Sequence, residues 1–188
     1  VEAGHRDETL RLWVNDACLV QGTHRSCRSG WHRAERAAEL GVPIHLRTTG
    51  GGTVYHDRGN LNWSFYLRRS AGYFGAAGLF RSCAGFIIEA LRPLGIEAAF
   101  AAPNRIDAGG RKVSGISARA SLEAVLVHGT LLVSSDIDRE RGELPETGQG
   151  EGLHLLPRAG ARRGGVKEEG HVQVPLVLWA LSQALKLF

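Results

Sequence analysis

The sequence predicts an α+β fold with mixed, mainly antiparallel β-sheets flanked by helices. Short runs of alternating apolar residues outnumber runs with a helical period, and the two kinds follow one another without regular βαβ alternation. The chain has 188 residues, of which 43% are hydrophobic and 22% are charged. This length and composition suit one large domain with a substantial core. We therefore expect a single domain over residues 1–188.

The first third of the chain is expected to hold short strands and one helix. Leu10–Val14 and Cys18–Gln21 flank Asn15-Asp16, a pair that favours a tight turn, so they predict a β-hairpin. Trp31–Leu40 has a helical period that stops at Gly41-Val42-Pro43. Further short strands are expected at residues 44–47, 53–55 and 61–67.

The rest of the chain begins with its most regular helical pattern, at Ala76–Leu94. Its apolar residues recur at helical spacing, and Pro93-Leu94-Gly95 supplies a stop. Gly109-Gly110 predicts the turn of a hairpin. Strands are expected at residues 96–100, 105–107, 112–118 and 124–133, a mobile loop at 141–170 and a closing helix at 174–188.

Charge and cysteine content exclude several classes of partner. The net charge is +4 and the pI is about 9.3, but the basic residues are mostly Arg dispersed among acids, which argues against nucleic acid. No apolar run approaches a bilayer span, so we expect no membrane partner. Cys18, Cys27 and Cys83 are odd in number and have no CxxC spacing, which fits reduced thiols. The sequence therefore favours a cytoplasmic protein.

The segment Arg47–Phe65 contains three consecutive glycines among hydroxyl, cationic and aromatic residues. Gly50, Gly51 and Gly52 let the backbone adopt positive φ and approach a ligand closely, with N–H groups able to face an anion. A flexible hairpin turn is the alternative. No Gly-Lys-Ser/Thr follows the triplet and the next residues predict a strand, so it is neither a nucleotide P-loop nor a dinucleotide fingerprint.

Two later segments also carry possible chemistry. Lys112 follows a predicted hairpin turn and precedes the small residues Ser114, Gly115 and Ser117, which leave room for it to extend along the sheet. Most lysines in such a place are simply exposed. In the other segment, His128-Gly129-Thr130, a glycine interrupts an apolar strand and predicts close approach of the backbone to something.

Together these segments resemble the lipoate-protein ligase family, which shares its catalytic fold with biotin protein ligases and octanoyltransferases. The resemblance covers about Leu10 to Asp136, in the family's order. It is carried by Leu12-Trp13-Val14-Asn15, RTTGGGTVYHDRGN at Arg47–Asn60, RKVSGIS at Arg111–Ser117 and HGTLL at His128–Leu132. It implies a biotin/lipoate ligase-like catalytic domain.

The resemblance implies that ATP activates lipoate to lipoyl-AMP, and that the lipoyl group then passes to a lysine of an acceptor protein. Lys112 is the implied catalytic residue, bridging the acyl carbonyl and the phosphate. Nucleotide-binding residues implied are Arg47, Gly52, Thr53, Val54, Tyr55, Asn104, Asp107 and Lys112. Lipoate-binding residues implied are Arg47, Gly50, Gly51, Gly52, Lys112, His128, Gly129 and Thr130.

Mg²⁺ would accompany ATP, held chiefly by phosphates and without a dedicated protein metal site. The family's adjacent Asn-Asp is separated here by Arg105-Ile106, which weakens the implied roles of Asn104 and Asp107. His24, Cys27 and His32 have loosely metal-like spacing but no fourth partner nearby, so we do not expect zinc. Asp57 is expected to brace the loop by accepting backbone hydrogen bonds.

The implied partner is a lipoyl domain or a glycine-cleavage H-like protein, with a separate accessory-domain subunit as a further possibility. The family's N-terminal helix is not recognisable before Leu10, and no accessory domain is expected after the catalytic region. Three alternatives remain: an octanoyl or lipoyl transferase, a biotin ligase and a non-enzymatic adaptor. Ala99 stands where related transferases have their cysteine, the biotin-type Gly-Arg-Gly-Arg is absent, and the intact charged positions disfavour an adaptor.

Overall fold

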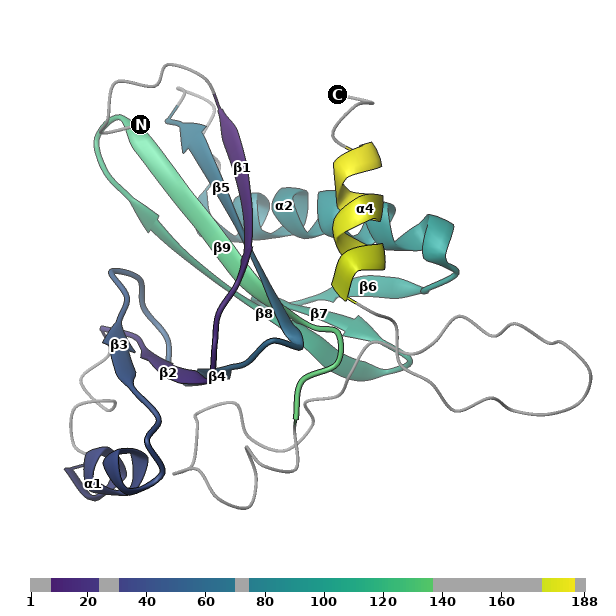
Figure 1. Ribbon diagram of the computed structural model, residues 1–188. Helices are drawn as coiled ribbons and strands as arrows, with labels where there is room; N and C mark the ends of the chain where they lie inside the picture. The colour runs from purple at the N-terminus through teal and green to yellow at the C-terminus, as the bar shows by residue number, and fades with distance from the viewer. Residues whose placement is uncertain (1–7, 24–30, 70–74, 137–173, 185–188) are drawn as a thin grey trace, which may run out of the picture.

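The computed structural model describes residues 8–23, 31–69, 75–136 and 174–184, which form two β-sheets and their covering helices (Figure 1). The larger sheet has six strands in the order β1-β5-β9-β8-β7-β6, and the smaller has three in the order β3-β2-β4. All neighbouring strands pair antiparallel except β2 and β3. The prediction of an α+β fold with mainly antiparallel sheets is confirmed.

The strands are β1 (Thr9–Val14), β2 (Cys18–Gln21), β3 (Ile44–Leu46), β4 (Thr53–His56), β5 (Asn60–Arg68), β6 (Ala98–Ala101), β7 (Arg105–Ala108), β8 (Arg111–Ala120) and β9 (Ala124–Leu132). The helices are α1 (Trp31–Glu39), α2 (Gly75–Leu91), the 3₁₀ turn η2 (Arg92–Leu94) and α4 (Val174–Ala184). Each agrees with its predicted segment to within a few residues. The predicted loop at 141–170 lies outside the described residues.

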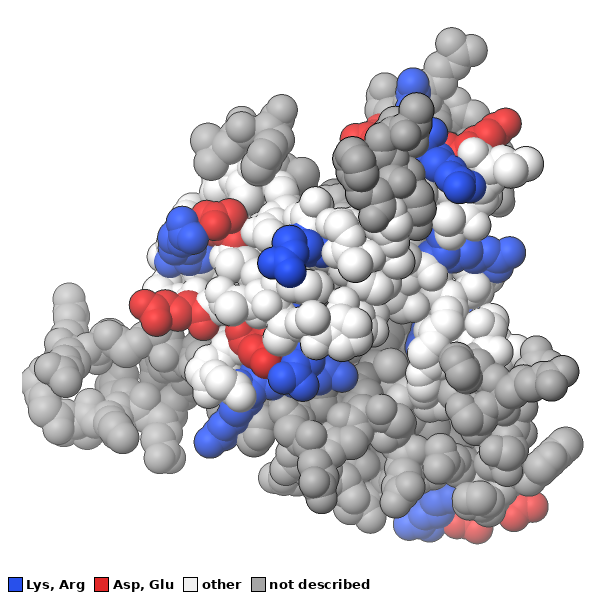
Figure 2. All heavy atoms as spheres, turned by 180° about the vertical axis from the view of Figure 1, so that it is seen from behind, with Lys and Arg blue, Asp and Glu red and all other residues white. Residues whose placement is uncertain are grey.

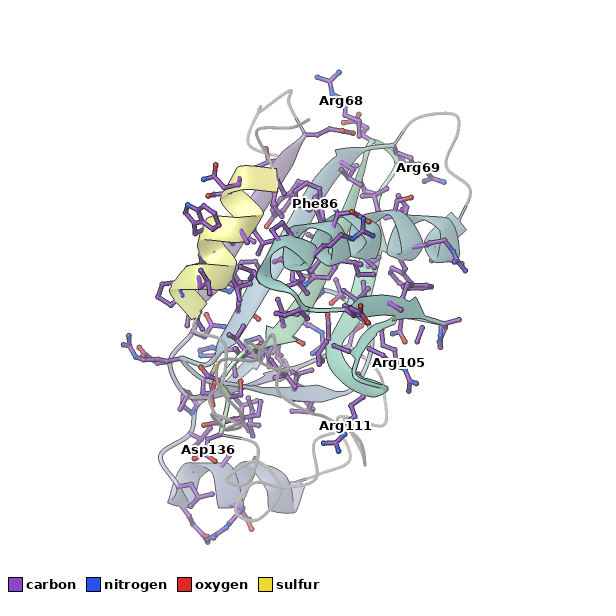
Figure 3. The ribbon with its side chains drawn as sticks, turned by 90° about the vertical axis from the view of Figure 1, so that its right-hand side faces the viewer. Arg68, Arg69, Phe86, Arg105, Arg111 and Asp136 are labelled. Carbon is purple, nitrogen blue, oxygen red and sulfur yellow. The ribbon has the colours of Figure 1, made fainter. Side chains whose placement is uncertain are left out.

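The main core lies between one face of the six-stranded sheet and the helix α2, and α4 packs in turn on α2 (Figure 1). Trp63, Ile87 and Leu131 are fully buried there, and Phe65 meets Phe86 of α2 edge-on at 5.4 Å between ring centroids (Figure 3). A second, smaller core packs α1 against the three-stranded sheet. The two cores therefore cover one face of each sheet.

The predicted hairpin between Leu10–Val14 and Cys18–Gln21 is wrong. β1 pairs along its length with β5, whereas β2 lies between β3 and β4 in the other sheet. The apolar side chains explain the separation, because Leu10 and Leu12 pack on the main core and Leu19 is buried in the small one. Asn15-Asp16 is thus a crossing between sheets instead of a tight turn.

The surface carries charges of both signs. Basic and acidic side chains are interspersed on the rear face of the molecule (Figure 2). Among the described helices, none is long and apolar enough to cross a membrane.

Candidate functional site

A cavity of about 650 Å³ lies between the exposed face of the large sheet and the glycine loop. Ligand pockets usually fall in this range of volume. Its lining comes from β1, β5, β8 and β9 below and from residues 47–54 above. The lining side chains of β5 and β9 point away from the main core, and Phe80 of α2 also contributes to the wall.

The floor of the cavity follows from strand alternation. On β5 and β9, every second side chain is buried in the main core, as with Leu61, Trp63, Val127 and Leu131. Their neighbours point the other way and line the cavity: Asn62, Ser64 and Tyr66 on β5, and Leu126, His128 and Thr130 on β9. A polar floor therefore lies on the reverse of an apolar core.

Arg47 organises the glycine loop from within. Its Nη1 donates to the carbonyl of Val20 at 2.7 Å, and its Nη2 donates to the carbonyls of Gly50 and Gly52 at 2.8 and 2.7 Å. Arg47 also lines the cavity, as predicted, but its guanidinium is engaged by backbone oxygens. Gly51 has a φ of +93°, so a glycine is required at that position.

Three further hydrogen bonds tie the loop to the floor. The hydroxyl of Ser117 donates to the carbonyl of Gly50 at 3.0 Å, and Thr49 Oγ1 lies 2.6 Å from His128 Nε2. Arg119 donates to the carbonyl of Thr48 at 3.2 Å. The loop is therefore fixed over the sheet and is not a flexible turn.

Lys112 reaches the cavity because of a β-bulge. Across β7 and β8, Ile106 pairs with Ser114 whereas the next residue, Asp107, pairs with Lys112, so β8 holds an extra residue there. Val113 and Ser114 are both fully buried as a result. The bulge reverses the alternation and places Lys112 on the cavity face, where its Nζ extends over the bare backbone of Gly115.

Two neutral histidines flank Arg47 in the cavity. Burial, with smaller contributions from Arg47 and His128, lowers the pKa of His56 to about 4. Burial and Arg47 likewise hold the pKa of His128 at about 4. His56 Nδ1 accepts a hydrogen bond from the Asn15 amide at 2.8 Å. Neither imidazole carries charge at neutral pH, so they leave Arg47 and Lys112 as the cations lining this cavity together with Arg11.

Two predicted residues are not among those that line the cavity. The side chain of Tyr55 turns into the small core beside Leu19 because it alternates with Val54 and His56, which do line the cavity. Asp107 shares the cavity face with Lys112, its partner across the strands, but it bonds Arg105 at 3.0 Å on the curved β7–β8 hairpin (Figure 3). The implied nucleotide contact of Tyr55 stays a prediction, and its side chain lies in the small core.

The remaining predicted residues come together. Gly50, Gly51, Gly52, Thr53, Val54, Lys112, His128, Gly129 and Thr130 all line the cavity, with Asn104 at an exposed point of its wall. Asn104 is fixed there because its side-chain amide and its carbonyl both bond the backbone of Ile116, each at 2.8 Å. Asn104 lies just before the start of β7 and Asp107 lies near its end, so the two residues are separated along this strand.

Gly129 is required by the core. It pairs with Trp63 across the strands, and a Cβ at Gly129 would collide with the indole and with the carbonyl of Gly115. The close approach that the sequence predicts here is therefore to a buried tryptophan. Gly129 contributes only backbone to the cavity.

Sequence reasoning missed several lining residues, including Arg11, Asn62, Ser64, Tyr66 and Phe80. The polar residues within the apolar strand β5 were the available signal, since Asn62 and Ser64 alternate with Leu61, Trp63 and Phe65. Phe80 gave no signal, because it fits the helical period of α2.

The other sequence candidates have structural explanations. Asp57 accepts backbone hydrogen bonds from Gly59 and Asp136, both at 2.8 Å, so the predicted bracing role is confirmed. Cys18 and Cys83 are buried, and burial raises the pKa of both thiols, that of Cys83 to about 12. His24 and Cys27 lie outside the described residues, within which no three His, Cys, Asp or Glu side chains form a metal cluster.

Comparison with known proteins accounts for this arrangement. Residues 1–150 match the family described as the lipoyl protein ligase A/B catalytic domain. The chain belongs to this family. It is 40% identical over 129 residues to the lipoate-protein ligase LplJ of Bacillus subtilis, covering 69% of this chain and 38% of that protein. It is 33% identical over 135 residues to a lipoate-protein ligase A of Psychrobacter cryohalolentis, covering 70% and 37%.

Solved structures of this family share the fold. A bi-partite lipoate protein ligase from Thermoplasma acidophilum, studied with its E2 lipoyl domain, gives a TM-score of 0.76 at 21% identity over 96% of this chain and 70% of that one. A lipoate-protein ligase A bound with ATP gives 0.74 at 24% identity, over 96% and 72%. The chain spans about half or less of the length of the curated relatives it matches first, at 51%, 38% and 30%.

Proposed function

We propose that this catalytic domain belongs to an ATP-dependent lipoate-protein ligase that forms lipoyl-AMP and transfers the lipoyl group to a lysine of an acceptor protein. The observation that carries the proposal is Lys112, turned by the bulge into the cavity beneath the glycine loop. Lipoate and the α-phosphate of ATP are both anions. Bringing them within bonding distance requires fixed positive charge and oriented N–H donors in a partly dry site.

The chain's residues divide that work between them. Lys112 binds the carboxylate and the phosphate together and stabilises the charge that develops as pyrophosphate leaves. The glycine loop supplies backbone donors such as the Thr53 N–H, and the hydrogen bonds of Gly50 with Ser117 and of Thr49 with His128 hold it over the sheet. The neutral imidazoles of His56 and His128 add hydrogen-bonding groups without competing for the anions.

Mg²⁺ would be carried to the site by the nucleotide, whose phosphate charge it neutralises. The donor set fits this arrangement, because the described residues form no cluster of three metal-ligating side chains. Asp107 Oδ1 is buried and accepts no hydrogen bond from the described residues, so Asp107 is the carboxylate that suits such an ion. Arg105 holds the other oxygen of the same carboxylate.

Transfer to the acceptor needs no nucleophile from the protein. An acyl-adenylate has an excellent leaving group, so the acceptor lysine need only be deprotonated and aligned. The T. acidophilum ligase is described together with its E2 lipoyl domain, and we propose the same class of acceptor here. Cys18 and Cys83 do not line the cavity and are held as thiols, which disfavours transfer through an acyl-cysteine on either.

The test uses the full natural protein with lipoate, ATP and a lipoyl domain. We expect lipoate-dependent exchange of pyrophosphate into ATP, and a lipoyl adduct on one acceptor lysine by mass spectrometry. Transfer from preformed lipoyl-AMP without pyrophosphate exchange would show that adenylation depends on a separate accessory subunit. Failure of both half-reactions, or transfer of octanoate from acyl-carrier protein without ATP, would refute the ligase assignment.

A further inference from the structure

The bonds made by Arg47 determine which way the glycine loop presents its peptide groups. The carbonyls of Val20, Gly50 and Gly52 all converge on one guanidinium at 2.7 to 2.8 Å. Such short charge-assisted bonds hold each carbonyl in a fixed direction. The negative ends of these peptide dipoles therefore meet at the guanidinium, and the Gly50 carbonyl also accepts a hydrogen bond from the Ser117 hydroxyl.

The Gly52 carbonyl also determines where the opposite end of its own peptide points. In a trans peptide the C=O and the following N–H are antiparallel, so the Gly52 carbonyl fixes the direction of the Thr53 N–H. That carbonyl faces Arg47 and the N–H of Gly22, next to β2. The Thr53 N–H consequently points away from β2, at the open edge of the small sheet, where Thr53 lines the cavity.

Two glycines make room for the guanidinium. A Cβ at Gly22 would lie 2.8 Å from Arg47 Nη2, and a Cβ at Gly51 would lie 2.9 Å from the same atom. A Cβ at Gly22 would also collide with the carbonyl of Gly51. The space around Arg47 is thus closed on both sides, and the guanidinium fits it with little freedom.

We propose that Arg47 is a positioning residue, which turns the carbonyls of the glycine loop inward so that the loop's N–H groups face the phosphate of the acyl-adenylate. This inference rests on the proposed function, and it replaces direct binding of lipoate or nucleotide as the main role of Arg47. A planar guanidinium can bond several carbonyls in fixed directions at once. A lysine ammonium is a point charge and cannot reproduce that geometry.

The first experiment measures the loop itself in the ligand-free protein. Amide hydrogen exchange of Gly22 and Thr23, whose N–H groups donate to the carbonyls of Gly52 and Thr49, is compared in the parent, in Arg47→Lys and in Arg47→Gln. We expect exchange at least about tenfold faster in both variants, because charge alone does not hold the carbonyls. Arg92→Lys is the matched control, since Arg92 is an exposed arginine paired with Glu89 on the far side of the core. Unchanged exchange in Arg47→Lys would overturn the proposal.

The second experiment measures adenylation in the same variants. We expect kcat for lipoate-dependent pyrophosphate exchange to fall by about 100-fold in Arg47→Lys and Arg47→Gln alike, since the oriented donors are lost in both. Arg47→Lys with near-parent kcat would show a role for charge and overturn the proposal. If the parent neither forms the adenylate nor transfers from preformed lipoyl-AMP, the proposed function fails, while the exchange measurement still decides how Arg47 holds the loop.

Discussion

At the scale of single residues, Lys112 depends on its neighbours for its place in the cavity. The extra residue in β8 turns it to the cavity face, and Gly115 leaves the path of its side chain open. A lysine in an unbulged strand with the same sequence would point into the main core. The chemistry of this residue therefore depends on the bulge at the next residue, Val113.

Removal of the Lys112 ammonium should abolish most activity and leave the fold intact. Lys112→Ala is expected to lower kcat for pyrophosphate exchange by about 100-fold or more, because fixed charge at the reacting phosphate is lost. Arg111→Ala serves as the control, as Arg111 is the exposed neighbour on the β7–β8 hairpin (Figure 3). Equal rates in Lys112→Ala and the parent would remove Lys112 from the mechanism.

Two glycines should respond in opposite ways to the same substitution. Gly129→Ala drives a methyl group into Trp63 and the Gly115 backbone, and should lower the free energy of unfolding by about 1–3 kcal/mol. Gly85→Ala meets open space within α2 and should raise it by about 0.5–1 kcal/mol. Urea unfolding measures both. A neutral Gly129→Ala would contradict the packing explanation of this glycine.

At the scale of elements, the sequence predicted the helices and strands well but did not predict which strands pair. Each predicted helix and strand in the described residues is present in the structure. They could be predicted because the apolar period of each lies within one short segment. The pairing of β1 with β5 could not be read in that way, since the partners are about fifty residues apart in the chain. A turn-like dipeptide at Asn15-Asp16 suggested a local partner, and the burial of Leu10 and Leu19 in separate cores decided against it.

The free energy of unfolding should fall as the pH drops, because His56 on β4 and His128 on β9 are neutral in the folded protein. The pKa values of His56 and His128 are about 4 in the folded protein against an ordinary 6.5, so the unfolded chain binds more protons between those values. The free energy of unfolding then decreases as pH falls through that window, by at most ~1.4 kcal/mol per pH unit for each histidine.

Urea unfolding at about pH 7.5, 6 and 5 checks this dependence. His128→Asn should weaken the fall in stability with acid, because one of the two groups no longer takes up a proton on unfolding. His45→Asn is the control, since His45 lies on the exposed strand β3. Identical pH profiles for His128→Asn and the parent would show that His128 is not held neutral by the fold.

At the scale of the whole molecule, the cavity joins two sheets that are built from separate cores. Ligand bound there should stabilise both together, because it binds the folded state alone. We expect lipoate and octanoate, each with ATP, to raise the melting temperature by several degrees above its value with ATP alone, and biotin with ATP to give no rise beyond that of ATP. A shift with biotin alone would contradict a lipoate-type site.

The sequence by itself determined the α+β class, nearly all of the elements and the family, because these follow from local periodicity and from motifs that lie contiguous in the chain. Tertiary structure alone decided what the motif residues do. It placed the Tyr55 side chain in the small core, packed Gly129 against Trp63 and brought three carbonyls within hydrogen-bonding distance of Arg47. The physical reason is that a side chain's partners depend on strand register, bulges and sheet pairing, which join residues far apart in sequence.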